Sequence, residues 1–325
     1  MASRDGNGWV TCTLGHQHWG KFGAAGLLAY AGGPDEVRVL LQHRCWWSHH
    51  GGTWGLPGGA ADSHESPVAA ALREAAEECA VPVGALVVRG VYADIHGGWT
   101  YHTIFASAAA PFEAYPASDE TDDVTWAAVP GVGGLELHPG FAAHWAELAG
   151  ALAPLTVIVD AANVVGSRPD GWWRDRVGAA RRLVTELAAL AGQGMTDLPA
   201  ELGLPAPARW FPDIVVVLEG QARGAAPAGT PSAGAAGAAA LGGEGRLSVV
   251  SADGSGDDAI ARLAGELPGR RIVVTADREL KARCAVAGAV LAGPRWLTGQ
   301  FGGAQGGQAG EQRGDRDGDE RGGAR

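Results

Sequence analysis

The stretch from residue 52 to residue 81 constrains the fold of this chain more than any other. Ser66 followed by Pro67 is typical of a helix start, because serine caps the first turn and proline tolerates the first helical position. The alanine-rich run that follows favours a helix, and Pro82 ends it. The sequence therefore predicts one helix in this stretch, entered from a glycine-rich turn.

Acidic side chains are spaced along this predicted helix so that they share one face. Glu74, Glu77 and Glu78 stand at positions i, i+3 and i+4. Carboxylates that close repel one another, and a hard divalent cation such as Mg²⁺ cancels the repulsion. Arg73 can orient Glu77 from the side, and Glu65, just before the cap, can reach toward the same face. We therefore predict a Mg²⁺ site here, with Mn²⁺ as the second candidate ion.

The turn before the helix, residues 56–59, lets the backbone approach a ligand because Gly58 and Gly59 carry no Cβ. Turn and helix together resemble the signature of the Nudix hydrolases, Gly-x5-Glu-x7-Arg-Glu-U-x-Glu-Glu-x-Gly-U with U apolar. Every charged position of that signature is filled here. Ala75 is a small residue at an apolar position, and Ala80 replaces the final glycine. A left-handed Ala80 would cost about 1–2 kcal/mol, so we expect the helix to end in another way.

The resemblance implies an α/β/α sandwich with a mixed sheet over about residues 8–152. It also implies that the signature glutamates and arginine form the catalytic and metal-binding set and that Gly58 and Gly59 contact the substrate. One of the helix glutamates, or Glu120 in the acidic loop before Trp126, would deprotonate water; a solvated loop explains Glu120 equally well. The alternative for the whole stretch is a charged, solvent-facing helix, which the fixed register of four acids and one arginine disfavours.

Length and composition fit two ordinary domains. The chain has 325 residues, 46% of them hydrophobic, which is ample for packed cores. A formal net charge of −11 argues against broad electrostatic binding to nucleic acid. The four cysteines are scattered without metal-ligand spacing and indicate free thiols. No signal peptide or membrane span is evident, so we expect a cytoplasmic protein, and its Ala-, Gly- and Arg-rich composition is typical of a high-GC bacterium.

The segment from Arg44 to His50 contains two adjacent tryptophans and ends in two adjacent histidines. It could bind a base or pack as a loop, and we favour packing because adjacent tryptophans more often fill a core. His49 and His50 lack helical metal spacing, so we assign them no metal. Neither this segment nor residues 94–99 shows a pattern that names a substrate.

The second half alternates strands and helices as a parallel α/β domain does. We predict its limits at residues 154 and 300 and expect a fragment that starts near Pro154 to fold alone. Residues 223–245 form a Gly/Ala/Pro tract, interpreted as a disordered insertion, and residues 301–325 are interpreted as a disordered tail. Strands are predicted at 155–159, 214–218, 247–250 and 271–275, and helices at 173–190, 257–267 and 278–287.

Acidic residues follow the predicted strands of this half. Asp160, Glu219 and Asp277 each stand at or just past a strand end, the edge where open α/β sheets place their sites. Asp258, or Asp257 as the alternative, begins a helix that can face the same edge. We therefore predict that these carboxylates form a second metal site.

The runs VDAANVVG, SGDDAI and VVTADREL, which carry most of these acids together with Asn163, resemble motifs of the PIN-like nuclease superfamily, in particular its NYN branch. The resemblance implies a PIN-like α/β/α domain with a parallel sheet, in which carboxylates hold Mg²⁺ or Mn²⁺ and a metal-activated water cuts RNA. The alternative is helix capping by Asp257 and Asp277. We favour the metal site, because capping does not require Asp160 beside them.

Two functional hypotheses remain open. In the first, the chain is a Mg²⁺-dependent pyrophosphohydrolase acting on a nucleoside diphosphate linked to another group, with a ribonuclease in its second half. In the second, the first half senses nucleotides and regulates, or is tethered to, a domain that binds or cuts RNA. The complete set of acids favours the first, because a pure binder need not keep a base. The expected partners are a nucleotide and RNA, without a membrane.

Overall fold

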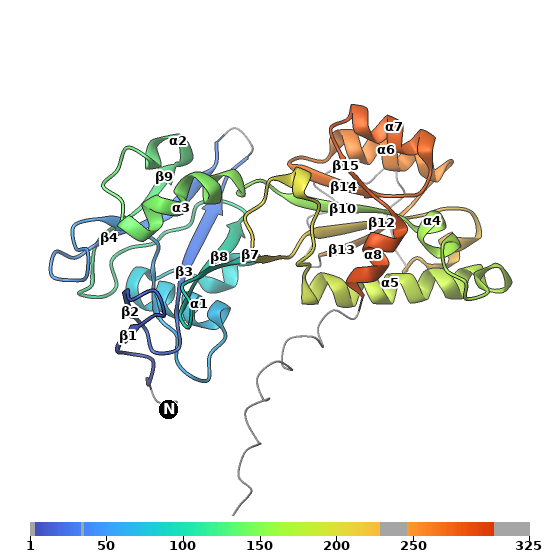
Figure 1. The fold of residues 1–325 in the computed structure, drawn as a ribbon. Helices are drawn as coiled ribbons and strands as arrows, with labels where there is room; N and C mark the ends of the chain where they lie inside the picture. The colour runs from blue at the N-terminus through green and yellow to red at the C-terminus, as the bar shows by residue number, and fades with distance from the viewer. Residues whose placement is uncertain (1–3, 34–35, 228–245, 302–325) are drawn as a thin grey trace, which may run out of the picture.

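The computed structural model describes residues 4–33, 36–227 and 246–301, which form two lobes (Figure 1). The first lobe is built on a mixed sheet with the order β11-β7-β8-β3-β4-β5, to which β6 adds on β3 and β9 on β4. In this sheet β3 and β8 run parallel, and the other pairs are antiparallel. Its strands are β3 (Ala24–Ala31), β4 (Arg38–Arg44), β5 (Trp54–Gly55), β6 (Gly58–Ala60), β7 (Leu86–Ile95), β8 (Thr100–Ala108), β9 (Thr121–Ala128) and β11 (Ala208–Trp210).

Helices cover both faces of this sheet, so the predicted α/β/α arrangement is present. One face packs against α1 (Pro67–Cys79) through buried alanines, and the other against α3 (Pro139–Gly150) through Phe141, Trp145 and Leu148. A short helix, α2 (Val129–Val132), follows β9. A separate antiparallel hairpin, β1 (Trp9–Thr11) and β2 (Gln17–Trp19), precedes the sheet.

The start of α1 agrees with the sequence prediction, whereas its end does not. The Ser66 hydroxyl accepts a hydrogen bond from the Ala69 amide at 3.2 Å, with Pro67 at the first helical position. At the other end Ala80 adopts the left-handed conformation, with φ 52° and ψ 33°. Our expectation that the helix would avoid this conformation was wrong. The backbone amides of Ala80 and Val81 both donate to the Ala75 carbonyl, and these bonds offset the cost of the strained residue.

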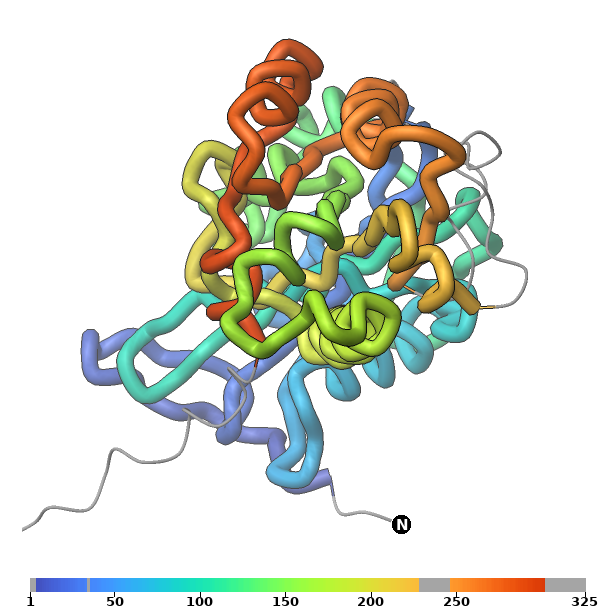
Figure 2. The backbone as a smooth tube through the Cα atoms, turned by 90° about the vertical axis from the view of Figure 1, so that its right-hand side faces the viewer, coloured from blue at the N-terminus to red at the C-terminus, as the bar shows by residue number. Residues whose placement is uncertain are grey.

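The second lobe is a five-stranded, all-parallel sheet with the order β13-β12-β10-β14-β15. Figure 2 looks toward this lobe, with α6 and α7 on one side of the sheet and α5 on the other. The strand order reverses direction between β10 and β14, and open α/β sheets place their sites at the carboxyl ends of the strands at such a point. The elements are β10 (Leu155–Asp160), β12 (Asp213–Leu218), β13 (Leu247–Ser251), β14 (Arg270–Val274), β15 (Val290–Ala292), α4 (Ala161–Gly166), α5 (Arg176–Gln193), α6 (Gly256–Glu266), α7 (Arg278–Val286) and α8 (Pro294–Gln300).

The two lobes share structure, which the sequence did not predict. β11 lies within the second half of the chain but pairs with the edge strand β7 of the first lobe. Its Trp210 is buried against Phe105, with ring centroids 5.0 Å apart, and a Cβ on Gly90 would stand 2.6 Å from the Trp210 ring. An ion pair of 2.7 Å between Arg89 and Asp213 also ties β7 to β12 of the second lobe. The expected independence of the second half therefore does not agree with the structure.

Several other expectations concern segments that the structure describes only in part. The predicted insertion at 223–245 begins inside a 3₁₀ helix, Gly220–Ala225, and its residues 228–245 lie outside the described ranges, as do residues 302–325 of the predicted tail.

All four cysteines are free and buried. Among the helices described, none is long and apolar enough to cross a membrane.

Candidate active site

Arg73 is the centre of the acidic cluster on α1. Its guanidinium donates to both carboxylate oxygens of Glu65, at 2.7 and 2.9 Å, and to Glu74 at 2.7 Å and Glu77 at 3.3 Å. These bonds lower the pKa of Glu65. Because both oxygens of Glu65 face the arginine, Glu65 orients Arg73 and does not turn toward the open face of the helix. Arg4 reaches the same cluster and pairs with Glu77.

Glu78 is the most buried acid of the cluster. Its side chain is 6% exposed and accepts a hydrogen bond of 3.1 Å from the Gly58 amide. Burial, with the nearby charge of Glu74 second, raises the pKa of Glu78 to about 8. Burial likewise raises the pKa of Glu74, although Arg73 opposes this effect. Two neighbouring carboxyls that resist ionisation are a favourable place for a divalent cation, because the cation replaces their lost hydration.

The glycines before α1 allow the turn to lie directly against these acids. A Cβ on Gly59 would stand 2.9 Å from the Glu74 carboxylate, and a Cβ on Gly58 would stand 2.3 Å from the Ala25 carbonyl oxygen. Any side chain at either position would push β6 away from β3 or displace the carboxylate. From the sequence we expected Gly58 and Gly59 to contact a ligand. In the structure both glycines lie between the acids and a cavity.

A cavity of about 400 Å³ opens beside Gly58 and Gly59. Its wall is aromatic and histidine-rich, a surface suited to the flat face of a purine or pyrimidine base. These residues come from separate elements, so no local sequence pattern could have identified them together. They include Trp9, His18, Trp19, Tyr92, His96, Trp99, Tyr101, His138, Phe141 and His144.

The packing interpretation of the segment from Arg44 to His50 was wrong for its tryptophans. Trp46 is 81% exposed and Trp47 is 53% exposed, so neither fills a core. Arg44 and His49 instead line the cavity. The sequence alone does not distinguish adjacent tryptophans that fill a core from adjacent tryptophans that lie exposed in a loop.

Glu120 lies outside α1, on the loop that ends at β9. Its side chain is exposed, and its charge contributes to the raised pKa of Glu78. Its backbone carbonyl accepts a hydrogen bond of 3.0 Å from the Cys45 amide, which fixes the loop beside the segment that follows β4. Glu120 is therefore near enough for its charge to act on Glu78, and no hydrogen bond joins the two side chains within the described residues.

Comparisons with known proteins agree with this geometry. The NUDIX domain model matches residues 22–147. A protein of Mycobacterium tuberculosis named "Putative 8-oxo-dGTP diphosphatase 3" is 48% identical over 160 residues, which are 47% of this chain and 72% of that protein. The chain belongs to the Nudix family. It is a Nudix hydrolase, an enzyme that acts on pyrophosphate bonds.

Two further relatives match the same lobe. A nucleoside triphosphate pyrophosphatase/Nudix hydrolase fusion protein of Bifidobacterium longum is 37% identical over 46% of this chain and 32% of its own length. The crystal structure of RenU, a Nudix hydrolase of M. smegmatis, is 47% identical and covers 44% of this chain and 92% of that one, with a TM-score of 0.41. Each of these relatives matches less than half of this chain.

The second lobe also gathers acids, at the carboxyl ends of its parallel strands. Asp160 is 5% exposed and accepts hydrogen bonds from the Asn163 amide, the Asn163 side chain and the Thr275 hydroxyl, at 3.0, 2.6 and 2.8 Å. Glu219 accepts from the Gly256 amide at 2.7 Å, and Asp277 caps α7. Asn163 therefore orients Asp160 and also accepts from the Ala276 amide at 3.2 Å with its side-chain oxygen.

Asp257 faces this group of acids, and Asp258 does not. Burial raises the pKa of Asp257, and the charges of Asp160, Asp277 and Glu219 raise it further. Asp258 turns instead to Arg283, with which it forms an ion pair of 2.7 Å, and its side chain is 73% exposed. From the sequence we preferred Asp258 as the metal ligand, with Asp257 as the alternative; the contacts in the structure favour Asp257.

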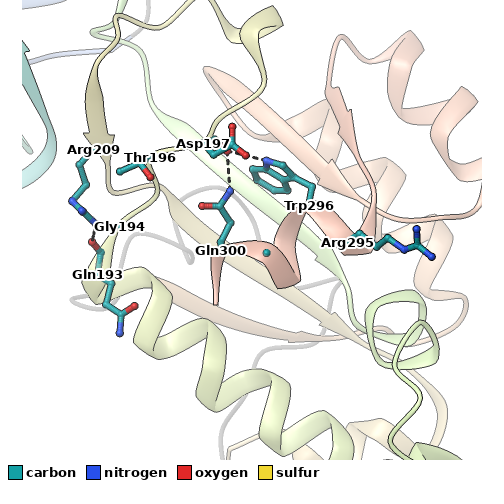
Figure 3. A pocket seen from close by; sticks show the side chains of 9 residues that line it. Gln193, Gly194, Thr196, Asp197, Arg209, Arg295, Trp296 and Gln300 are labelled. Atoms are coloured by element: carbon teal, nitrogen blue, oxygen red, sulfur yellow. Dashed lines mark hydrogen bonds between the residues drawn. The ribbon is translucent and has the colours of Figure 1, made fainter. Parts of the chain in front are cut away.

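A smaller cavity of about 240 Å³ lies between the end of α5, the segment before β11 and α8 (Figure 3). Trp296 and Gln300 both donate to the main-chain carbonyl of Asp197, at 2.9 Å each. Arg209 and Arg295 also line the cavity, and no predicted site residue is among its lining residues. It adjoins neither acid cluster, and we assign it no function.

Proposed function

We propose that the Nudix lobe hydrolyses a nucleoside diphosphate linked to another group, and that oxidised purine nucleoside triphosphates are its first candidate substrates. The observation that carries this proposal is the position of the α1 acids directly behind Gly58 and Gly59, two residues that line an aromatic cavity. A base held in the cavity would place its phosphates toward Gly58, Gly59 and the carboxylates. The name of the mycobacterial relative, "Putative 8-oxo-dGTP diphosphatase 3", supports the choice of 8-oxo-dGTP as the first substrate to test.

The donor set on α1 fits a divalent cation such as Mg²⁺. Glu74, Glu77 and Glu78 offer carboxylate oxygens from one helix face. Arg73 pairs with Glu74 and Glu77, whereas Glu78, the most buried of the three, forms no ion pair within the described residues. Glu65 is left out of this set, because Arg73 takes both of its oxygens. When bound, Mg²⁺ neutralises phosphate charge and lowers the pKa of a coordinated water.

The protein's own groups supply position and proton transfer. Arg73 fixes Glu74 and Glu77 along the helix, and the Gly58 amide fixes Glu78. Burial raises the pKa of Glu78 to about 8 in the metal-free protein, and a bound cation would lower it, so that the ionised carboxylate could accept a proton near neutral pH. Glu78 is thus one candidate base, and Glu120, which approaches from the loop before β9, is the other.

A nucleotide panel tests the substrate class. Purified protein with Mg²⁺ would be given 8-oxo-dGTP, dGTP and sugar-linked nucleoside diphosphates, with release of pyrophosphate or nucleoside monophosphate measured. Turnover of one class with a kcat/KM at least about tenfold above the others, a difference of about 1.4 kcal/mol in transition-state binding, is expected. Tight binding of a nucleotide without turnover of any would contradict hydrolysis and favour the sensor hypothesis.

We also propose a second function, metal-dependent cleavage of RNA by a PIN-like site in the second lobe. It is supported by the meeting of Asp160, Glu219, Asp257 and Asp277 at the sheet edge where the strand order reverses. Burial, with the charges of the other three acids after it, raises the pKa of Asp257, and a bound Mg²⁺ or Mn²⁺ would offset both effects.

A matched pair of variants tests this second site. Asp257→Asn should abolish cutting of single-stranded RNA in Mn²⁺, while Asp258→Asn, one residue along the same helix, should leave it nearly unchanged. With the chain's net charge of −11, RNA binding should be weak and fall as salt rises. Failure of the folded full-length protein to cut RNA with any of several metals would identify the lobe as an RNA- or partner-binding module.

A further inference from the structure

The tip of the β1–β2 hairpin brings a cysteine and two histidines together. The Cys12 amide donates to the His16 carbonyl and the Gly15 amide to the Cys12 carbonyl, at 2.9 Å each, so the chain turns tightly around the Cys12 side chain. The sulfur of Cys12 and one ring nitrogen from each of His16 and His18 all lie within 4.8 Å of one another. Cys12 is 6% exposed, whereas His16 is exposed at the outer side of the turn.

A second loop brings another histidine beside this group of three ligand residues. The Thr13 amide donates to the Gly97 carbonyl at 3.0 Å, so the hairpin tip rests on the loop between β7 and β8 (Figure 2). The His96 ring centroid then stands 4.8 Å from that of His18 and 6.4 Å from that of His16. Segments far apart in the sequence thus converge on one point, which explains why the cysteine spacing alone showed no metal motif.

The His18 ring is oriented but incompletely bonded. It stacks on Trp99, with centroids 4.1 Å apart and planes at 11°, and Trp99 is itself fixed by a hydrogen bond of 2.8 Å to the Gly20 carbonyl. Nε2 of His18 is buried and has no hydrogen-bond partner among the residues that the structure describes. An unpaired buried polar nitrogen is costly. A metal ion at the centre of the cluster would remove this cost.

The His96 ring is held in the way that metal-binding histidines usually are. Its Nε2 lies 2.9 Å from a carboxylate oxygen of Asp94. A histidine that donates one ring N–H to a carboxylate leaves its other nitrogen free as a metal ligand of raised basicity. In this tautomer Nδ1 of His96 is the nitrogen available to the cluster.

We propose that Cys12, His16, His18 and His96 form a structural zinc site, separate from the magnesium site on α1. One thiolate and three imidazoles are soft and borderline ligands, which select Zn²⁺ over Mg²⁺. Four protein ligands leave no open position for substrate, so the ion would hold structure and not perform catalysis. It would clamp the hairpin to the β7–β8 loop, and both of these segments line the substrate cavity.

Cobalt substitution tests the site in the full-length protein. Chelator-treated protein would be loaded with Co²⁺ in excess Mg²⁺, and its visible and near-ultraviolet absorption recorded. One Co²⁺ per chain with the intense bands of a tetrahedral thiolate complex, displaced by Zn²⁺, is expected. Cys12→Ser should lose the thiolate band, while Cys45→Ser, which changes another buried cysteine outside the cluster, should keep it. Absence of the band in the wild type, or its survival in Cys12→Ser, would overturn the proposal.

A second variant keeps the test decisive if Cys12→Ser does not fold. His16 is exposed, so His16→Gln leaves no buried defect. The variant should lower the Zn²⁺ affinity at least about tenfold, because even the loss of a residue that only hydrogen-bonds a metal ligand costs about 10- to 100-fold in affinity. Zn²⁺ should also raise the melting temperature of the chelated wild type more than that of His16→Gln. Equal Zn²⁺ affinity and equal thermal shifts in the two proteins would show that the cluster is ordinary packing.

Discussion

Individual carboxyls on α1 differ sharply in their surroundings, although they are close in sequence. Glu65 is neutralised by Arg73, Glu77 is partly exposed beside Arg4, and Glu78 is buried against the backbone of the preceding turn. The pattern of charges in the sequence identified these residues as one group. It could not assign them different tasks, because burial and hydrogen bonding depend on the turn that packs over them.

The first prediction at the residue scale concerns Glu78. Glu78→Gln keeps the size of the side chain and removes its charge, so we expect hydrolysis to fall at least about 10²-fold, as when a transition-state-stabilising group is lost. Because the pKa of Glu78 is raised from 4.5 to about 8, the metal-free fold loses stability as the pH rises from 4.5 to about 8, and the full loss persists above 8. The variant should therefore be at least as stable as the wild type at pH 8–9 in chelator.

Steady-state kinetics and urea unfolding measure these two effects. Glu201→Gln, a change to an exposed acid in the second half of the chain, is the matched control and should alter neither. An unchanged rate in Glu78→Gln would remove this residue from the catalytic set.

A second prediction at this scale concerns pH. Burial, with the charges of Arg44, His50 and His49 after it, lowers the pKa of His138 to about 4. The folded protein therefore binds fewer protons than the unfolded chain between about pH 6.5 and pH 4. The free energy of unfolding should decrease as the pH is lowered from 6.5 to 4, because in this range His138 binds a proton in the unfolded chain but not in the folded protein.

His138→Asn should flatten this part of the stability curve. The His138 ring accepts the capping hydrogen bond of α3 from the Gly140 amide, and asparagine can replace that cap without titrating. Urea unfolding at half-unit pH steps measures the effect. Identical pH slopes for the variant and the wild type would show that another group controls acid stability.

At the element scale, α1 ends in a way that makes its last residue a target for stabilisation. Ala80 holds a left-handed conformation that glycine adopts at little cost. Ala80→Gly should raise the free energy of unfolding by about 1 kcal/mol. The matched control is Ala76→Gly, which places glycine at a half-buried position in the interior of the same helix and should lower it by about as much. Opposite signs in chemical unfolding confirm the prediction; a loss of stability in both variants contradicts it.

Elements with a strong local pattern could be predicted from the sequence, and those defined by distant partners could not. The cap and alanine face of α1 are local, and so are the apolar runs of β10, β12 and β14, which the structure confirms within one or two residues. β11 is a three-residue strand whose only signal is its fit against β7. The cavity wall has the same character, because Tyr101 and His138 meet only after the sheet has formed.

At the scale of the whole molecule, β11 makes each lobe depend on the other. Trp210 fills the core of the first lobe from a strand that belongs, by sequence, to the second half. Trp210→Ala should lower the free energy of unfolding by about 3–5 kcal/mol, the range for removing a large buried aromatic side chain. Trp47→Ala removes an exposed tryptophan and should change it by less than about 0.5 kcal/mol. Similar losses in the two variants would show that β11 contributes little to the first lobe.

The position of β11 in the chain also has a consequence for synthesis. A ribosome that has delivered residue 152 has produced every residue of the candidate active site but has left the edge of β7 uncovered. Translation at about 5–20 residues per second leaves that edge open for some seconds before residues 208–210 emerge. Until then the nascent lobe presents an unpaired strand beside the gap that Trp210 will fill, and such edges invite pairing with other chains. The enzyme is therefore most vulnerable to aggregation between the completion of its active-site sequence and the completion of its sheet.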